Sequence, residues 1–165
     1  MRLILAAGVS LVLLGCGGKG DRAAPGQTAV HDSGFAGVQA RGAVAMGVNQ
    51  YTSAHRFQPL PDGGRIELQR GVDDSAGADR IRSHMREIAA RFSEGDFRLP
   101  GFVHARLVPG TVTMATRRAG ITYTVERLPR GAAVRIRSAD PDAIEAIHEF
   151  LAFQRRDHHA DHHDS

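Results

Sequence analysis

The chain has little of several residue types that small proteins use to fold or to bind. Its 165 residues include no tryptophan, two tyrosines and a single cysteine, Cys16. One cysteine cannot form an internal disulfide, so packing, or packing plus a metal ion, must hold the fold together. Lys19 is the one lysine among 21 basic residues, and 18 acids are interspersed among them. This charge pattern and the few aromatics predict no nucleic-acid partner.

Long hydrophobic runs are also lacking, and the longest one stands near the beginning of the chain. Residues 3–14 are almost all apolar, but they are too few for the roughly 20 residues that cross a bilayer as a helix. The basic Arg2 precedes this run and Leu13-Leu14-Gly15-Cys16 ends it, which is the pattern of an export signal. We therefore expect residues 1–15 to be a cleaved signal peptide.

The end of this segment resembles a bacterial lipobox. The resemblance implies cleavage before Cys16, with lipid added to its thiol and to the new amino terminus. The membrane would then be a partner through the lipid on Cys16. Glycine rather than aspartate follows Cys16, which resembles signals for the outer membrane. We expect a lipoprotein anchored in the outer membrane and facing the periplasm.

Composition divides the rest of the chain into three parts. Residues 16–41 are rich in Gly, Ala, Asp and Ser, which predicts a lipidated cysteine followed by a flexible tether. Residues 42–157 are predicted to form a single α+β domain, and residues 158–165 a histidine-rich tail. Residues 40–46 fit either a short helix or the end of the tether.

Two hairpins and two long helices are predicted in this domain. Alternating apolar and polar residues predict strands over residues 51–57, 65–70, 121–125 and 134–137. The turn signals Pro61-Asp62-Gly63-Gly64 and Pro129-Arg130-Gly131 join these strands in pairs. Helical spacing predicts a helix over residues 78–92, and Asp140-Pro141 begins another. Residues 111–118 fit either a short helix or a strand.

The two hairpin–helix stretches resemble each other. Residues 60–68 match residues 128–136 in pattern, and Ile81 and Ile88 correspond to Ile144 and Leu151. One such unit is too small to close a core by itself. We predict an α+β fold in which two hairpin–helix repeats (ββα–ββα) form a four-stranded antiparallel sheet, with both helices packed on one face. Coincidence between two ordinary hairpins is the alternative interpretation of the match.

Histidines are frequent, with nine in the chain, and four of them stand where a core is predicted. His55 shares a strand face with Phe57, while His84 and His148 lie on the apolar stripes of the two helices. His104 stands in the long connection between the repeats. Imidazoles suit Zn and Cu, and a site needs three or four converging ligands. These four histidines are our candidate metal site; the alternative is four separate core histidines.

The tail adds a second histidine pattern. His158 and His162, like His159 and His163, are four residues apart, which places each pair on one face if the last helix extends that far. Such pairs can chelate a soft divalent ion. The alternative is a solvated terminus that binds metal only as any polyhistidine does.

Enzyme signatures are missing from the sequence. His148-Glu149-Phe150-Leu151-Ala152 has alanine where a zinc-protease helix needs its second histidine. No G-x-S-x-G occurs, and lipidation of Cys16 would leave no free thiol. The sequence therefore favours a protein that is not an enzyme, and it selects no catalytic residue and no organic cofactor.

Several segments carry a resemblance to known proteins: residues 46–50, 55–57, 95–97, 135–137 and 146–154. Over about residues 40–158 the chain resembles a family of small exported bacterial proteins of unknown function. The resemblance implies export, gives weight to His55, His104 and His148, and implies no reaction. Such proteins are sometimes labelled aspartate carbamoyltransferase, but this chain lacks Ser-Thr-Arg-Thr-Arg and has only about half the length of that two-domain enzyme.

Two functions compete at this point. The leading hypothesis is an envelope lipoprotein that binds a copper or zinc ion through the candidate histidines, with the tail histidines capturing or delivering ions. The rival is a structural or interaction module whose sheet face exposes Arg65, Arg135 and Arg137 to an envelope protein, lipid A or a polyanion. A small hydrolase with a histidine base is a third interpretation, and it lacks an evident nucleophile.

Overall fold

The structure is a computed structural model that describes residues 26–47 and 52–159. The predicted signal peptide, the lipidation of Cys16 and the distal tail histidines lie outside these residues. The elements in chain order are α1 (Gly26–Met46), β1 (Ser53–Leu60), β2 (Gly63–Arg70), α2 (Ser75–Ser93), α3 (Arg98–His104), α4 (Thr111–Thr116), the 3-10 helix η2 (Arg118–Gly120), β3 (Ile121–Leu128), β4 (Gly131–Ser138) and α5 (Pro141–Asp157). None of the described helices is both long and apolar enough to cross a membrane.

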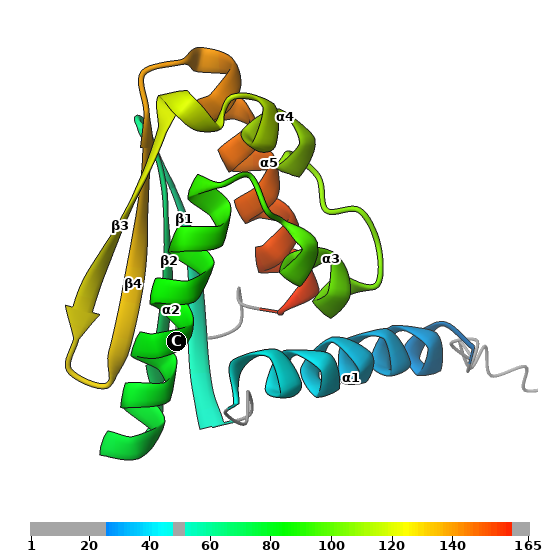
Figure 1. Ribbon diagram of the computed structural model, residues 1–165. Helices are drawn as coiled ribbons and strands as arrows, with labels where there is room; N and C mark the ends of the chain where they lie inside the picture. The colour runs from blue at the N-terminus through cyan, green and yellow to red at the C-terminus, as the bar shows by residue number, and fades with distance from the viewer. Residues whose placement is uncertain (1–25, 48–51, 160–165) are drawn as a thin grey trace, which may run out of the picture.

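The four strands form one antiparallel sheet in the order β1-β2-β4-β3, and helices cover one of its faces (Figure 1). The covered face carries the core, where Leu68, Val134 and Ile136 are buried beneath the helices. Alternate residues of each strand point to the same side, so one apolar stripe per strand is enough to build this layer. The predicted α+β class and four-stranded antiparallel sheet are confirmed.

The two hairpins have the same internal register. Ser53 pairs with Arg70 in the first, and Ile121 pairs with Ser138 in the second, so a shift of 68 residues maps one hairpin onto the other. Between the hairpins, β2 and β4 pair so that Ile66 lies opposite Val134, the residue that the same shift assigns to it. The hairpins are therefore arranged about an approximate twofold axis through this pair. The repeat of the whole hairpin–helix unit stays a prediction.

Helices α2 and α5 each lie over the hairpin that they do not directly follow in sequence. Helix α2 lies over β3 and β4, whereas α5 lies over β1 and β2. The guanidinium of Arg82 in α2 donates hydrogen bonds to carbonyl oxygens at the β3–β4 turn, those of Leu128, Pro129 and Gly131, at 2.8–3.1 Å. The crossing ties the two halves into one body.

His148 does the same from α5. Its Nε2 lies 2.9 Å from the carbonyl oxygens of both Leu60 and Gly63 at the β1–β2 turn. Arg82 and His148 each stand eight positions after the aspartate that caps their helix, Asp74 and Asp140 respectively. This position holds a hairpin turn in place, and His148 is a structural histidine rather than a member of a histidine cluster.

Two other segments differ from or refine the predictions. Helix α1 occupies Gly26–Met46, most of the stretch predicted as a flexible tether. Its helical order was hidden because its apolar residues do not form a single stripe. The undecided segment 111–118 is helical, as α4 followed by the start of η2. Its cap is Gly110, with φ of 78°, and the Thr111 hydroxyl donates to the Val108 carbonyl.

Candidate functional site

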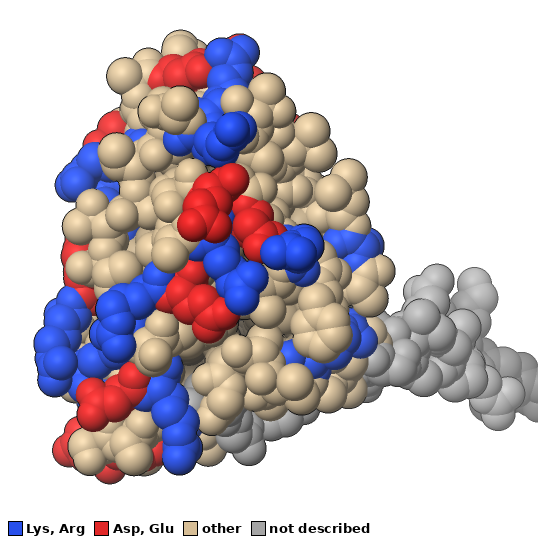
Figure 2. Space-filling model, in the orientation of Figure 1, with Lys and Arg blue, Asp and Glu red and all other residues tan. Residues whose placement is uncertain are grey.

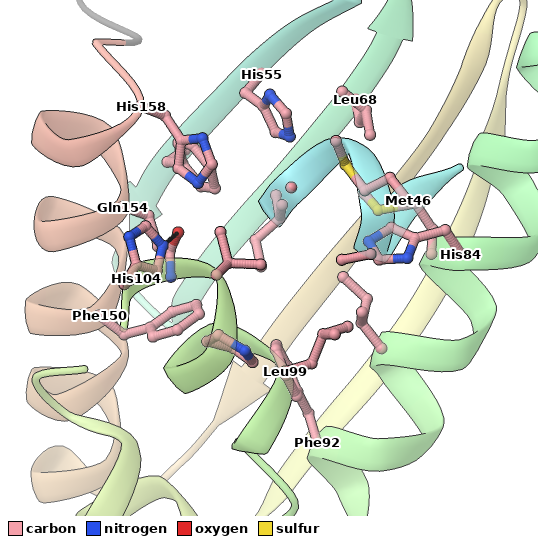
Figure 3. A pocket seen from close by; sticks show the side chains of 18 residues that line it. Met46, His55, Leu68, His84, Phe92, Leu99, His104, Phe150, Gln154 and His158 are labelled. Atoms are coloured by element: carbon pink, nitrogen blue, oxygen red, sulfur yellow. Dashed lines mark hydrogen bonds between the residues drawn. The ribbon is translucent and has the colours of Figure 1, made fainter. Parts of the chain in front are cut away.

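A cavity of about 80 Å³ lies between the sheet and the helices, beside α1. This space exceeds the roughly 10–15 Å³ that one water molecule requires. Its walls come from six elements and are mostly apolar (Figure 3). The lining residues include Gly42, Ala45 and Met46 of α1, Phe57, Ile66 and Leu68 of the sheet, Met85, Ile88 and Phe92 of α2, Leu99, Pro100 and Val103 of α3, and Phe150 and Gln154 of α5.

Four histidines also line this cavity, from four separate parts of the chain. They are His55 on β1, His84 on α2, His104 at the end of α3 and His158 just after α5. Three of them belong to the group that the sequence predicted to share a site. The fourth predicted member, His148, lies at the hairpin turn described above, and His158 takes its place.

The imidazole rings form a row rather than a ring of ligands. His55 and His158 are stacked, with ring centroids 4.8 Å apart, and His158 meets His104 edge to face at 5.1 Å. His84 lies on the opposite wall in Figure 3. Within the described residues, no group of three or more His, Cys, Asp or Glu side chains is arranged to hold a metal ion. Stacked rings present their faces to each other, whereas a shared ion requires converging nitrogens.

His104 is held by the end of α5. Its Nδ1 makes a short contact with a carboxylate oxygen of Asp157, and its Nε2 lies 2.9 Å from Oε1 of Gln154. Asp157 also accepts a 2.8 Å hydrogen bond from Arg106, whose guanidinium lies 4.7 Å from the centre of the Phe153 ring. Both nitrogens of His104 are thus occupied, so this ring fixes α3 to α5 and is not free to bind a ligand.

Burial keeps the remaining imidazoles of the cavity neutral. Desolvation lowers the pKa of His55 to about 4, with a smaller contribution from His84. Desolvation also lowers the pKa of His84, and it lowers that of His158 well below its ordinary value, helped by His55, His104 and His159. At neutral pH each of these rings therefore offers one N–H donor and one nitrogen lone pair.

Two of these rings have buried nitrogens that are not hydrogen-bonded. Nδ1 of His84 and Nδ1 of His158 have no partner among the described atoms. Buried polar side-chain atoms are nearly always paired with protein, water or a ligand, because leaving one unpaired costs about 1–3 kcal/mol. Because both rings line the cavity, they are the side chains through which a bound molecule could form hydrogen bonds.

The first two tail histidines belong to the folded domain. Helix α5 ends at Asp157, His158 is its C-cap, and His159 has a φ of 51°, so the chain leaves the helix at this point. The helical extension needed for the i,i+4 metal pairs is thus absent at His158 and His159. The His159 ring stacks on Phe35 of α1 at 4.1 Å. His162 and His163 lie outside the described residues.

Two of the three arginines that the sequence predicted to be exposed on the open face of the sheet, Arg65 and Arg135, are largely covered. Arg135 is only 8% exposed, because its guanidinium donates to the Gly64 carbonyl and to Asp62. Arg65 pairs with Glu126 at 2.8 Å. Arg137 is exposed as predicted, with 55% of its side chain accessible, and its Nε lies 3.5 Å from Asp62. Binding of a partner by this face stays a prediction.

Comparison with protein-family models, with curated proteins and with solved structures finds no match for this chain. The family resemblance stated from the sequence therefore stays a prediction. His158 and Gln154 were missed as cavity residues, although their four-residue spacing and an apolar helix stripe that reaches Phe150 and Phe153 could have indicated that they share a face.

Proposed function

We propose that this protein is a cell-envelope lipoprotein whose domain binds a small, mainly apolar molecule in the cavity beside α1. The observation that carries the proposal is an apolar cavity whose wall includes His84 and His158, two imidazoles that each have a buried nitrogen without a partner among the described atoms. Pockets of this kind, with apolar walls and a few convergent polar groups, are the usual form of small-molecule sites. The predicted export signal supports the location, and neither location nor lipidation rests on the fold.

The chemistry of the walls limits the ligand. Aromatic, aliphatic and methionine side chains, such as Phe57, Leu68 and Met85, favour an apolar body. A neutral imidazole can accept from a hydroxyl or donate to a carbonyl, but it offers no positive charge to a carboxylate. The expected ligand is therefore an uncharged molecule with one or two hydroxyl or carbonyl groups, placed to reach His84 or His158.

A copper or zinc ion is the competing ligand, because neutral imidazoles and buried lone pairs are also what these metals require. The observed stacking of His55 on His158 argues against it, since ligation by both rings would require at least one of them to turn. His104 would in addition have to leave Asp157 and Gln154. The organic ligand needs neither change.

The test compares phenol with benzene, which differ by one hydroxyl group, on the purified protein. Binding is followed by calorimetry and by the shift in thermal unfolding, with Zn²⁺ and Cu²⁺ titrated in parallel. We expect both aromatic probes to bind and phenol to bind more tightly. Replacing His84 with leucine should weaken the affinity for phenol by about tenfold, the equivalent of one hydrogen bond, and leave the affinity for benzene unchanged.

A cavity-filling variant and a matched control locate the binding. Ala45 lines the cavity, whereas the adjacent Val44 is 77% exposed on the same helix. Ala45→Leu should abolish binding of both probes without lowering the unfolding temperature. Val44→Leu should leave both the binding and the unfolding temperature unchanged. Binding that survives Ala45→Leu, or no binding of either probe, would refute the proposal. Micromolar binding of a metal ion that is lost in His55→Phe would establish the competing ligand.

A further inference from the structure

Gln154 differs from its neighbours on the cavity wall because it is polar, buried and uncharged. Apart from the four histidines, it is the only polar side chain among the described residues that line the cavity. It lies on α5, one turn after Phe150, and is 5% exposed. Figure 3 shows it next to His104. A glutamine amide combines a donor, its NH2 group, with an acceptor, its oxygen, so its partners decide what it offers to a ligand.

The oxygen of this amide already has a partner. Its Oε1 lies 2.9 Å from Nε2 of His104, and Nδ1 of the same ring contacts a carboxylate oxygen of Asp157. Both atoms that face the ring are oxygens that accept hydrogen bonds, so His104 donates one from each nitrogen and the carboxylate balances its charge. Arg106 donates to the second carboxylate oxygen at 2.8 Å and holds Asp157 in place.

The nitrogen of the amide has no hydrogen-bond partner among the described residues. It cannot exchange places with the oxygen, because its NH2 group would then face the Nε2–H of His104, donor against donor. A buried donor without a partner is unfavourable, so such groups are normally paired with water or with a ligand. Because Gln154 lines the cavity, its NH2 group is a donor that a bound molecule can meet.

The other polar groups of the cavity are less selective. His84 and His158 each have a nitrogen without a partner among the described atoms, but a neutral imidazole donates or accepts according to its tautomer. No lysine, arginine or acid stands among the described residues that line the cavity, whereas arginines and acids form mixed clusters on the outer surface in Figure 2. The cavity therefore offers no unpaired charge to an ionic ligand, and Gln154 supplies its one group of fixed polarity.

We propose that Gln154 determines the specificity of the cavity and selects an uncharged ligand whose carbonyl oxygen accepts a hydrogen bond from its NH2 group. The inference rests on the small-molecule site proposed above, and it narrows the ligand to a carbonyl compound with an apolar body. A carbonyl oxygen accepts and does not donate, so it matches this donor. His104 and Asp157 are positioning residues, because they hold the amide in this orientation.

The test compares three probes of one ring size on the purified full-length protein. Cyclopentanone accepts hydrogen bonds and donates none, cyclopentanol does both, and methylenecyclopentane has nearly the shape of the ketone and does neither. Calorimetry gives the affinity for each probe. Because the probes differ in hydration, the informative quantity is the change that a substitution causes in each affinity.

Two substitutions of Gln154 remove its donor in different ways. Gln154→Met removes both halves of the amide, and it should weaken the affinity for cyclopentanone by about tenfold while leaving that for methylenecyclopentane unchanged. Gln154→Glu keeps an oxygen for His104 and turns the other half into an acceptor, so cyclopentanone should again weaken while cyclopentanol stays bound. Gln58→Glu is the matched control on the opposite face of the sheet, where Gln58 is exposed on β1, and it should change none of the affinities.

Asp157→Asn tests the positioning role without changing the cavity wall. Without the carboxylate, His104 loses the proton from Nε2, which then accepts from the amide, and Gln154 turns its oxygen toward the cavity. The affinity for cyclopentanone should fall by about tenfold, whereas the affinities for cyclopentanol and methylenecyclopentane should be retained. If Asp157 had a purely structural role, the substitution would change all three affinities together.

The outcomes distinguish this inference from the proposed function. Failure of all three probes to bind would overturn both. If methylenecyclopentane binds and neither Gln154 variant changes the affinity for cyclopentanone, the cavity remains a binding site and the role of Gln154 is refuted. A loss confined to cyclopentanol would show that the amide oxygen faces the cavity, and would overturn the assignment of a carbonyl ligand.

Discussion

The two ends of the helical layer are built on matching hairpins but are finished differently. At one end, α4 lies against α5, and the backbone approaches so closely that a Cβ on Gly110 would lie 2.1 Å from the Ala146 carbonyl oxygen. Met114 is fully buried there. At the other end, α1 contributes Gly42 and Ala45 to the wall of a cavity. The core is thus filled around Met114, so the space beside α1 is not a general consequence of this topology.

Positions that the repeat relates to one another carry different ring side chains. Under the 68-residue shift that relates the hairpins, His55 corresponds to Tyr123, and both are aromatic rings on edge strands. Burial raises the pKa of Tyr123, whose hydroxyl has no hydrogen-bond partner among the described atoms. Counting from the two cap aspartates, His84 corresponds to Phe150, and His158 to Phe92. Only His55 and Tyr123 contrast the two ends, because Phe92 and Phe150 line the same cavity as His84 and His158.

The largest expected effect is on stability, and it is measured by replacing one methionine with alanine at each end of the helical layer. Met114→Ala should lower the free energy of unfolding by about 2–5 kcal/mol, since it leaves a void in a filled core. Met46→Ala should cost less than half as much, because Met46 already borders an empty space. Urea unfolding of both variants measures the difference. Equal losses would mean that the cavity beside α1 is filled in solution.

The second prediction compares the two side chains that hold the hairpin turns. Arg82→Met should cost about 2–3 kcal/mol, because it leaves three carbonyl oxygens at the β3–β4 turn without their charged donor. His148→Leu removes one nitrogen shared by two carbonyls and should cost about 1 kcal/mol. Neither change should alter phenol binding, which calorimetry can verify. Loss of phenol binding in His148→Leu would contradict the assignment of this residue to the turn.

Local patterns in the sequence were sufficient to predict the scaffold. Pro61-Asp62-Gly63 and Pro129-Arg130-Gly131 form turns where expected, and the Asp140 side chain caps α5 as predicted. Such features depend on a few neighbouring residues and on backbone preferences, so they can be recognised without tertiary information. The same holds for His55, whose strand alternation placed it on the core face.

The site could be predicted only in part. Helical spacing shows which face of the helix a residue lies on, but not which part of the sheet it will contact. His148 and His158 are both on α5 or directly after it, but one meets a hairpin turn and the other the cavity. Which of these two places a residue reaches depends on how α2 and α5 cross over opposite hairpins, and no local sequence pattern encodes that crossing. Helix α1 was anticipated only as one alternative for residues 40–46, because its apolar residues form no single stripe that could be recognised over Gly26–Met46.

The smallest expected effect concerns pH and contrasts His55 with its counterpart Tyr123. The pKa of His55 falls from the ordinary 6.5 to about 4 in the folded protein, so between these values the unfolded chain binds a proton that the native state does not. The stability that the neutral His55 ring contributes is therefore fully present above pH 6.5 and is lost as the pH falls toward 4. At pH 5.5 His55 can account for at most about 1.4 kcal/mol of this loss. In His55→Phe the loss measured by urea unfolding between pH 7 and pH 5.5 should shrink by about that amount, whereas Tyr123→Phe should leave it unchanged. An identical pH dependence in both variants would show that the His55 ring is solvated in the folded protein, and its lowered pKa would then not distinguish the two ends.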